Sequence, residues 1–140
     1  MTVLVDTSVW SLALRRPSHR LNFPEKAVVS ELSELIAEGR ARMIGLIRQE
    51  LLSGIKDLGQ FEKLKITLRA FPDEPLETAD HEAAAFAGNK CRSKGIAVSV
   101  VDMLICAVSQ SRGWSIFTTD PDFKLQAPIL LIKLHQPRRV

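Results

Sequence analysis

The sequence predicts an α/β fold in which a parallel sheet is covered by helices. Three observations support this prediction. Short apolar runs of strand length alternate with longer segments of helical periodicity. The apolar runs are continuous rather than alternating, which is typical of strands buried on both faces. Polar capping residues precede the helical segments and glycines follow them, so most element boundaries are marked.

The amino-terminal segment begins with a strand. Residues 2–5 are β-branched or aliphatic, and a helix is expected to begin around Thr7. Asn22 and Glu25 have the spacing of a capping box, which predicts the start of the next helix. Gly39 predicts its end, because glycine readily adopts the left-handed conformation that terminates a helix.

The middle of the chain predicts a second strand and two helices. Residues 43–46 form a short apolar run that leads directly into a helix ending at Gly54. Residues 58–68 carry an apolar stripe at helical spacing. The proline-rich stretch 71–75 is a break, and a short third strand at its edge has limits that the pattern does not define.

The carboxyl-terminal half predicts two helices. Thr78 is expected to cap an alanine-rich helix that runs to about Ser93, and Gly95 terminates it. Ser99 starts a second helix, which ends near Gly113.

Two strands complete the pattern. They are expected at residues 115–118 and 129–134, separated by a turn at 120–122. No repeat, low-complexity tract or linker interrupts the 140 residues, so we expect one domain spanning 1–140. The basic tail, residues 137–140, is expected to be flexible.

Composition narrows the class of protein. The chain has no apolar stretch of membrane-spanning length, and a charge at Asp6 comes too early for a secretory signal, so a cytoplasmic protein without a membrane partner is expected. Cys91 and Cys106 are expected to be reduced, buried thiols, and the dispersed histidines argue against a histidine metal site. Lysine and arginine outnumber acids by 19 to 16, which weakly favours a polyanionic substrate.

Four acidic residues suggest a chemistry. Asp6, Glu50, Asp102 and Asp120 each follow a short apolar segment. The carboxyl ends of parallel strands face a common crevice, so these side chains are expected to converge. Converging carboxylates repel one another, and Mg²⁺ or Mn²⁺ would relieve that repulsion. Metal-dependent phosphodiester cleavage is therefore the leading hypothesis.

Each acid also has a purely structural explanation. Asp6 is placed to cap the following helix, Asp102 to complete a capping box, and Asp120 to open an Asp-Pro turn. Glu50 is equally compatible with an exposed helix surface. None of the four is decisive alone, whereas their joint order is informative.

Four short motifs contain these acids. They are Asp-Thr-Ser-Val-Trp at 6–10, Gln-Glu-Leu-Leu-Ser-Gly at 49–54, Val-Asp-Met-Leu-Ile-Cys-Ala at 101–107 and Thr-Thr-Asp-Pro-Asp-Phe at 118–123. In this order they resemble the PIN-domain ribonucleases, and specifically the VapC-type toxins of toxin–antitoxin pairs. The resemblance covers nearly the whole chain, although residues 58–76 contribute little. It implies a three-layer sandwich with a twisted parallel sheet of about five strands flanked by helices.

The resemblance also implies a site. It assigns Asp6, Glu50, Asp102 and Asp120 to the acidic quartet of the family, with Mg²⁺ or Mn²⁺ held mainly by the three aspartates. Glu50 would position or deprotonate the attacking water, or bind a second ion.

Further residues are expected to support this site. Thr118 matches the hydroxyl residue two positions before the last acid, and Ser8 or Thr7 is expected to contribute hydrogen bonds. Asp122 could share or replace the role of Asp120.

The implied function is that of a metal-dependent endoribonuclease toxin with an RNA substrate and an antitoxin partner, and a homodimer is expected. Candidate RNA contacts are Arg15, Arg16, Arg20, Lys90, Arg92, Lys94 and Lys124. Trp10 and Phe123 flank the expected site in the sequence, and two roles remain open for their side chains: stacking on an RNA base, or packing in the core.

Two other classes remain open. Asp6 after a first strand also suits a phosphoaspartyl phosphatase or receiver-like protein, in which this carboxylate is the nucleophile. However, Asp6 is not closely followed by a second Asp, as in the dehalogenase-type phosphatases, and no acidic pair precedes it, as in receiver domains. A non-catalytic RNA- or protein-binding module on the same scaffold is the third possibility.

Overall fold

A computed structural model, which describes residues 1–138, has the predicted α/β architecture. Its strands are β1 (Val3–Val5), β2 (Ala41–Arg42) and β3 (Ser115–Phe117). They form one parallel sheet in the order β2-β1-β3. Two segments add single parallel bridges, Met43 with Asp73 and Ile116 with Leu134. The described sheet thus has three strands, and the expected number of about five is reached only by including these bridging segments.

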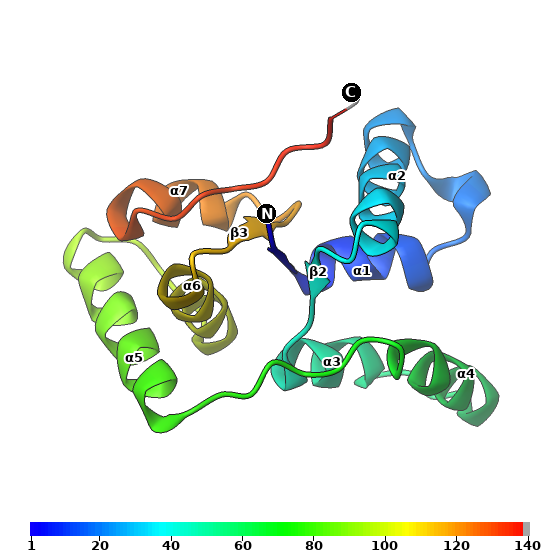
Figure 1. Ribbon diagram of the computed structural model, residues 1–140, viewed down its shortest axis with the longest axis horizontal. Helices are drawn as coiled ribbons and strands as arrows, with labels where there is room; N and C mark the ends of the chain where they lie inside the picture. The colour runs from blue at the N-terminus through cyan, green and yellow to red at the C-terminus, as the bar shows by residue number, and fades with distance from the viewer. Residues whose placement is uncertain (139–140) are drawn as a thin grey trace.

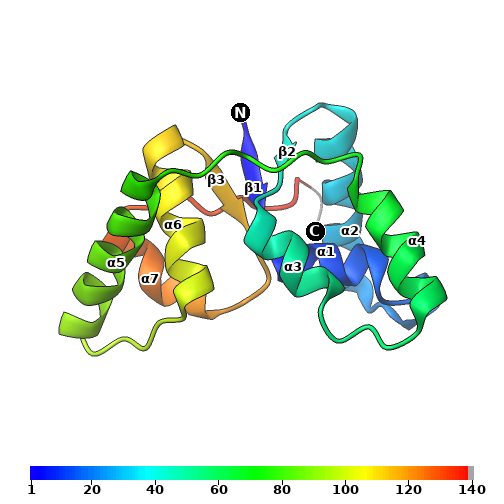
Figure 2. The same cartoon turned by 90° about the horizontal axis from the view of Figure 1, so that it is seen from below.

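Helices lie on both sides of the strands. They are α1 (Thr7–Leu14), α2 (Phe23–Ala37), α3 (Gly45–Leu52), α4 (Leu58–Leu68), α5 (Thr78–Ser93), α6 (Val100–Arg112) and α7 (Asp122–Leu130), with a 3-10 turn η1 (Ser18–Arg20) after α1. Helices α5, α6 and α7 gather on one side, and α1 to α4 on the other (Figures 1 and 2). The three-layer arrangement that the sequence predicts is confirmed.

The central strand lies entirely within the core. All three residues of β1 are fully buried, and so is Ile116 of β3. Trp10 of α1, Leu35 of α2 and Ile105 of α6 are also at most 1% exposed, so helices from both sides close over the sheet. Continuous apolar runs therefore correspond to strands covered on both faces, as expected.

One helix start follows the predicted capping chemistry in full and a second follows it in part. The Asn22 side chain accepts a hydrogen bond from the Glu25 amide, and the Glu25 carboxylate accepts one from the Asn22 amide, both at 2.9 Å. The Ser99 hydroxyl accepts a hydrogen bond from the Asp102 amide at 3.0 Å, but among the described residues the Asp102 carboxylate accepts none from the Ser99 amide, so the predicted capping box is half formed. Gly39 and Gly113 follow α2 and α6 with φ of +69° and +71°, the left-handed region that glycine tolerates best.

Helix α5 begins differently from the prediction. Thr78 is its first helical residue and not its cap. The Asp80 carboxylate instead reaches back to accept a hydrogen bond from the Glu77 amide at 2.9 Å. The helix start is thus satisfied by an acid in its first turn.

The second strand was predicted too late in the chain. Ala41 and Arg42 pair with Val3 and Leu4 in the register of the sheet. The backbone then leaves the sheet, because the amides of Ile47 and Arg48 already donate to the Ile44 carbonyl. Residues 45 and 46 therefore belong to α3 and not to a strand.

The predicted strand at 129–134 is wrong for its first half. Pro121 and Asp122 initiate α7, which continues through Leu130. The chain leaves this helix at Leu131, and only then do Lys133 and His135 exchange backbone hydrogen bonds with Ile116. The apolar run thus combines a helix end with one bridging residue, Leu134, which periodicity alone cannot separate.

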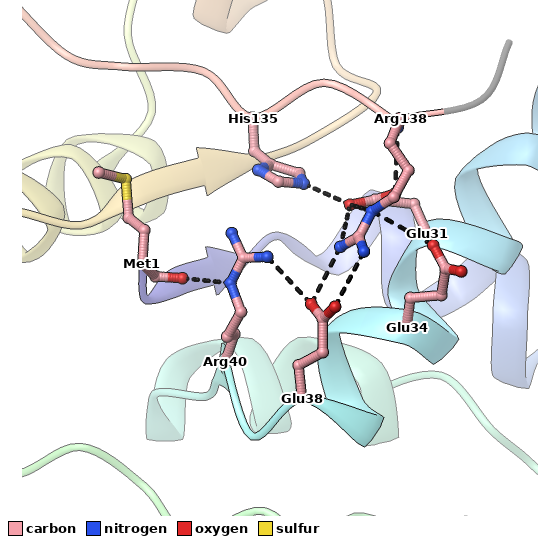
Figure 3. A network of polar contacts seen from close by, with 7 residues as sticks. All are labelled: Met1, Glu31, Glu34, Glu38, Arg40, His135 and Arg138. Carbon is pink, nitrogen blue, oxygen red and sulfur yellow. Dashed lines mark hydrogen bonds and ion pairs between the residues drawn. The ribbon is translucent and has the colours of Figure 1, made fainter.

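The described part of the basic tail is held by ion pairs. The Arg138 guanidinium contacts Glu31 of α2 and Glu38, the residue that follows α2, and just before the tail His135 lies 2.7 Å from the Glu31 carboxylate (Figure 3). The expected flexibility is therefore incorrect for Arg138. The rest of that expectation concerns residues 139–140, which lie outside the described residues.

Two expectations from composition can also be compared with the structure. Cys91 and Cys106 are free and buried, as expected. Within residues 1–138, no helix combines the length and apolarity needed to cross a bilayer.

One arginine connects the last turn of α6 to the first turn of α5. Arg112 donates to both carboxylate oxygens of Asp80, at 2.7 and 3.1 Å, to Glu74 at 2.7 Å and to the Pro75 carbonyl at 3.0 Å. The hydrogen bonds that Asp80 accepts from Arg112 and from the Glu77 amide lower the pKa of Asp80 to about 2. Helices α5 and α6 are thereby joined through one planar guanidinium.

We expect Arg112→Ala to lower the free energy of unfolding by about 2–4 kcal/mol, because it leaves two partly buried carboxylates without their cation. Urea denaturation followed by circular dichroism measures this loss. Lys65→Ala, which removes an exposed pair with Glu62 on α4, is the control and should cost less than about 1 kcal/mol. Equal losses in the two variants would contradict the role assigned to Arg112.

Candidate metal centre

The candidate site begins where β1 and β3 end. These strands are parallel neighbours, so the residues after them, Asp6 and Thr118, lie at the same edge of the sheet. The Asp6 amide donates to the Phe117 carbonyl at 2.9 Å, which continues the pairing one residue beyond β1. Two segments more than a hundred residues apart are thus aligned by backbone hydrogen bonds.

Two hydroxyl groups bind the same oxygen of Asp6. Ser8 donates to Oδ2 at 2.7 Å and Thr118 donates to it at 2.8 Å. Each hydroxyl has one proton, so each then acts as an acceptor toward the next loop: Ser8 for the Thr119 amide and Thr118 for the Asp120 amide, both at 3.0 Å. This network orients the segment that carries Asp120.

Asp6 also has the structural role considered in the sequence. Its Oδ2 receives a longer contact, 3.4 Å, from the Ser8 amide, and it is the N-cap residue of α1. It is only 5% exposed. Helix capping and membership of the site therefore coexist in one side chain.

Three further carboxylates form a close group beside Asp6. Asp102, Asp120 and Asp122 each offer an oxygen atom within 4.8 Å of the others. Asp120 lies at the start of α7 and accepts a hydrogen bond from the Asp122 amide at 2.9 Å. Among the described residues this close group includes Asp122, for which the sequence left two roles open: supporting the site, or sharing or replacing the role of Asp120. The spacing Asp-Pro-Asp at a helix start was the available signal for it.

The pKa of Asp102 reflects the negative charge that surrounds it. Burial and the negative charge of Asp6 raise its pKa, with smaller contributions from Asp120 and Asp122. The Ser99 hydroxyl opposes them, and the resulting pKa is about 6, against the usual 3.8. Desolvated like charges make the ionised form costly, so the site favours a cation.

Glu50 lies at the rim of the site. It is exposed on α3, and its Oε1 accepts a hydrogen bond from the Thr7 hydroxyl at 2.7 Å. Thr7 directly follows Asp6, so Glu50 is held close to the strand end without belonging to the three-acid group.

The predicted RNA contacts are distributed over different surfaces. Lys124 lines a small cavity together with Asp120. Arg16 forms an ion pair with Glu25 at 2.7 Å, and Arg15 lines a separate hollow between α1 and α4. The structure thus brings only Lys124 of these three close to the acids.

The two aromatic candidates belong to the core. Trp10 and Phe123 are each 1% exposed. The Trp10 indole donates to the Val5 carbonyl at 3.1 Å, and its ring contacts Phe71. Base stacking by these residues is therefore excluded in this structure, and core packing is the correct alternative.

Comparison with known proteins places the fold in a family. The family model described as the PIN domain matches residues 3–127. Comparison with curated protein sequences gives no match.

Solved structures with the same fold come from several bacteria. FitAcB from Neisseria gonorrhoeae superposes with a TM-score of 0.77 at 19% identity, covering 99% of this chain and 100% of that chain. VapBC2 from Rickettsia felis, bound to a DNA fragment from its promoter, gives 0.73 at 16% identity over 96% and 98%. A toxin–antitoxin complex from Klebsiella pneumoniae gives 0.65 at 13% identity over 99% and 100%. The domain match and the shared fold together show that the chain belongs to the PIN domain family.

Proposed function

We propose that this PIN-domain protein is a metal-dependent endoribonuclease and the toxin of a toxin–antitoxin pair. The observation that carries the proposal is the group of three carboxylates, with oxygens within 4.8 Å of one another, beside the buried Asp6. Carboxylate oxygens are the ligands that Mg²⁺ and Mn²⁺ prefer. Metal-assisted nucleases act on phosphodiesters through such acidic sites.

The donor set fits a hard divalent cation. Asp102 and Asp120 would hold the ion, with Asp6 or Asp122 completing the carboxylate set. The raised pKa of Asp102 indicates repulsion that a cation would remove. When bound, Mg²⁺ or Mn²⁺ supplies a water of lowered pKa and neutralises charge on the phosphate.

The protein's own groups would orient the reactants. Ser8 and Thr118 hold Asp6 Oδ2, so the Asp6 carboxylate keeps one direction. Glu50 carries a carboxylate at the rim, where Thr7 restricts its rotation. We assign Glu50 to the attacking water, as the acceptor of its proton or as the group that positions it.

An antitoxin partner is part of the proposal. The similar structures include FitAcB, VapBC2 and one that is described as a toxin–antitoxin complex. An arginine from such a partner could pair with the acids where a metal would bind, since a guanidinium matches carboxylates in a bidentate fork. The homodimer and the cytoplasmic location expected from the sequence belong to the same proposal.

The family membership favours this function over the alternatives. A phosphoaspartyl enzyme would use Asp6 as its nucleophile, but no second acid follows Asp6 closely in the sequence, as the phosphatases of that class require. A non-catalytic module would not need three closely spaced carboxylates beside the buried Asp6.

Substitution of the acids tests the activity. We expect Asp120→Asn to lower cleavage of a random single-stranded RNA pool in Mn²⁺ by at least about a hundredfold, because it removes a ligand charge. Asp122→Asn should be milder, since this residue is more exposed. Initial rates by gel electrophoresis measure both effects, and circular dichroism checks folding. EDTA should stop the wild-type reaction; full activity in EDTA, or in Asp120→Asn, would overturn the mechanism.

The raised pKa of Asp102 predicts that Asp102→Asn stabilises the metal-free protein, and that this gain depends on pH. In an unfolded chain an aspartate ionises near pH 4, whereas Asp102 in the folded protein ionises near pH 6. As pH rises across this window, the metal-free wild type loses stability that Asp102→Asn does not lose. We therefore expect the variant to have the higher Tm above pH 6, with the difference vanishing below about pH 4.

Thermal unfolding in EDTA from pH 4 to pH 8 measures this difference. Glu82→Gln, which neutralises an exposed acid on α5, is the control for simple loss of charge. Adding Mn²⁺ should raise the Tm of the wild type more than that of Asp102→Asn. A difference that does not depend on pH would contradict the crowding of charges at Asp102.

A further inference from the structure

A small cavity adjoins the three-acid group. It has a volume of about 170 Å³ and is formed partly by the start of α7 and partly by the carboxyl-terminal tail. We call it the tail pocket; its lining includes Asp120, Pro121 and Lys124 from one side and Leu134, Gln136 and Pro137 from the other. Asp120 belongs both to the tail pocket and to the acidic group. A molecule in this pocket would therefore lie directly beside the candidate metal centre.

The tail reaches this position through contacts with β3. The Ile116 amide donates to the Lys133 carbonyl at 2.9 Å, and the His135 amide donates to the Ile116 carbonyl at 2.7 Å. The His135 ring then meets Phe117 edge-on, with ring centroids 5.3 Å apart. Gln136 follows immediately, so its position depends on this pairing.

A clamp on α2 fixes the tail beyond Gln136. Glu31 is 2% exposed and accepts hydrogen bonds from the Arg138 amide at 3.1 Å and from its Nε at 3.0 Å. The same guanidinium donates to both oxygens of Glu38, at 2.9 and 3.0 Å (Figure 3). His135 occupies the other oxygen of Glu31 at 2.7 Å. The pocket wall, residues 136 and 137, is thus anchored on both sides.

The chemistry of the tail pocket suits one nucleotide of a nucleic acid. Lys124 is exposed and forms no ion pair within residues 1–138, so its charge is available to a phosphate. The Gln136 amide offers a donor and an acceptor, and it too has no hydrogen bond to the described residues. The two prolines supply apolar surface for a base. Proteins recognise single-stranded RNA by packing against its unstacked bases and by hydrogen bonding to the polar edges of those bases.

We propose that the tail pocket binds the nucleotide next to the scissile phosphate of the RNA substrate. Gln136 reads the base edge, Lys124 contacts the phosphate, and the Arg138–Glu31 clamp is a positioning device that holds the tail in place. This inference rests on the proposed ribonuclease function and adds to it the part of the chain that selects the cleavage site.

The test compares cleavage of a random single-stranded RNA pool by wild type, Gln136→Ala, Lys124→Gln and Arg138→Ala. Sequencing of the product ends gives the nucleotide preference beside the cut, and initial rates give KM and kcat separately. We expect Gln136→Ala to weaken the preference, and Lys124→Gln and Arg138→Ala to raise KM about five- to tenfold with a smaller change in kcat. Arg138→Lys, which keeps the charge but loses the fork, should fall between Arg138→Ala and wild type.

Arg40→Ala is the matched control. It removes the second arginine bound to Glu38, at 3.0 Å, and a hydrogen bond to the Met1 carbonyl, and Arg40 itself has no described contact with residues 136–138. It should leave KM and the nucleotide preference unchanged. If Arg138→Ala and Arg40→Ala behave alike, or if Gln136→Ala keeps the wild-type preference, the tail pocket does not select the nucleotide.

Failure of the proposed function would give a different result. If wild type cleaves no RNA in Mn²⁺, the ribonuclease proposal fails. Binding of the same labelled pool to the wild-type protein in EDTA, measured by fluorescence anisotropy, then tests the tail pocket independently of cleavage. Equal affinity with and without Lys124→Gln and Gln136→Ala would overturn the inference.

Discussion

The structure depends on one shared hydrogen-bond acceptor, the Oδ2 atom of Asp6. It takes hydroxyl protons from Ser8 at the start of α1 and from Thr118 at the end of β3. Both hydroxyls are then free only to accept, and they accept from the amides of Thr119 and Asp120. One buried carboxylate therefore sets the start of a helix, the end of a strand and the direction of the loop that carries the last acids. Because each hydroxyl has a single hydrogen to donate, few other arrangements of hydrogen bonds would satisfy these two hydroxyls and the two amides.

This arrangement concentrates negative charge, which opposes folding in the absence of a cation. Burial and its acidic neighbours raise the pKa of Asp102 to about 6. The described ion-pair networks lie elsewhere: Arg112 joins α6 to Asp80, and Arg138 joins the tail to α2. The chain thus joins its outer elements with paired charges, whereas the close group of Asp102, Asp120 and Asp122 has no described ion pair. A strained electrostatic site on a stable scaffold is typical of functional sites.

The carboxyl-terminal tail has a larger part in the site than its composition suggests. It adds a bridge to β3 at Leu134, contacts Phe117 through His135 and ends its described course on Glu31. Each of these contacts joins residues far apart in the chain, and together they bring Gln136 to the cavity that Asp120 lines. A segment that reads as a charged terminus therefore forms one wall beside the acids.

Local chemistry was sufficient to predict much of this protein. The capping box at Asn22, the left-handed glycines at 39 and 113, the buried run of β1 and the α/β class all follow from interactions within a few residues. The proximity of Asp102 and Asp120 to each other and to Asp6 was expected from the general geometry of parallel sheets and from the ordered motifs, whereas Glu50 lies outside the close group. Tertiary structure alone decided the features that depend on distant partners: that Asp122 joins the close acidic group, that residues 129 and 130 finish a helix, that Trp10 is core, and that Arg138 meets Glu31. Periodicity and capping report the preferences of neighbouring residues, whereas these features arise from contacts across the fold, which no local pattern encodes.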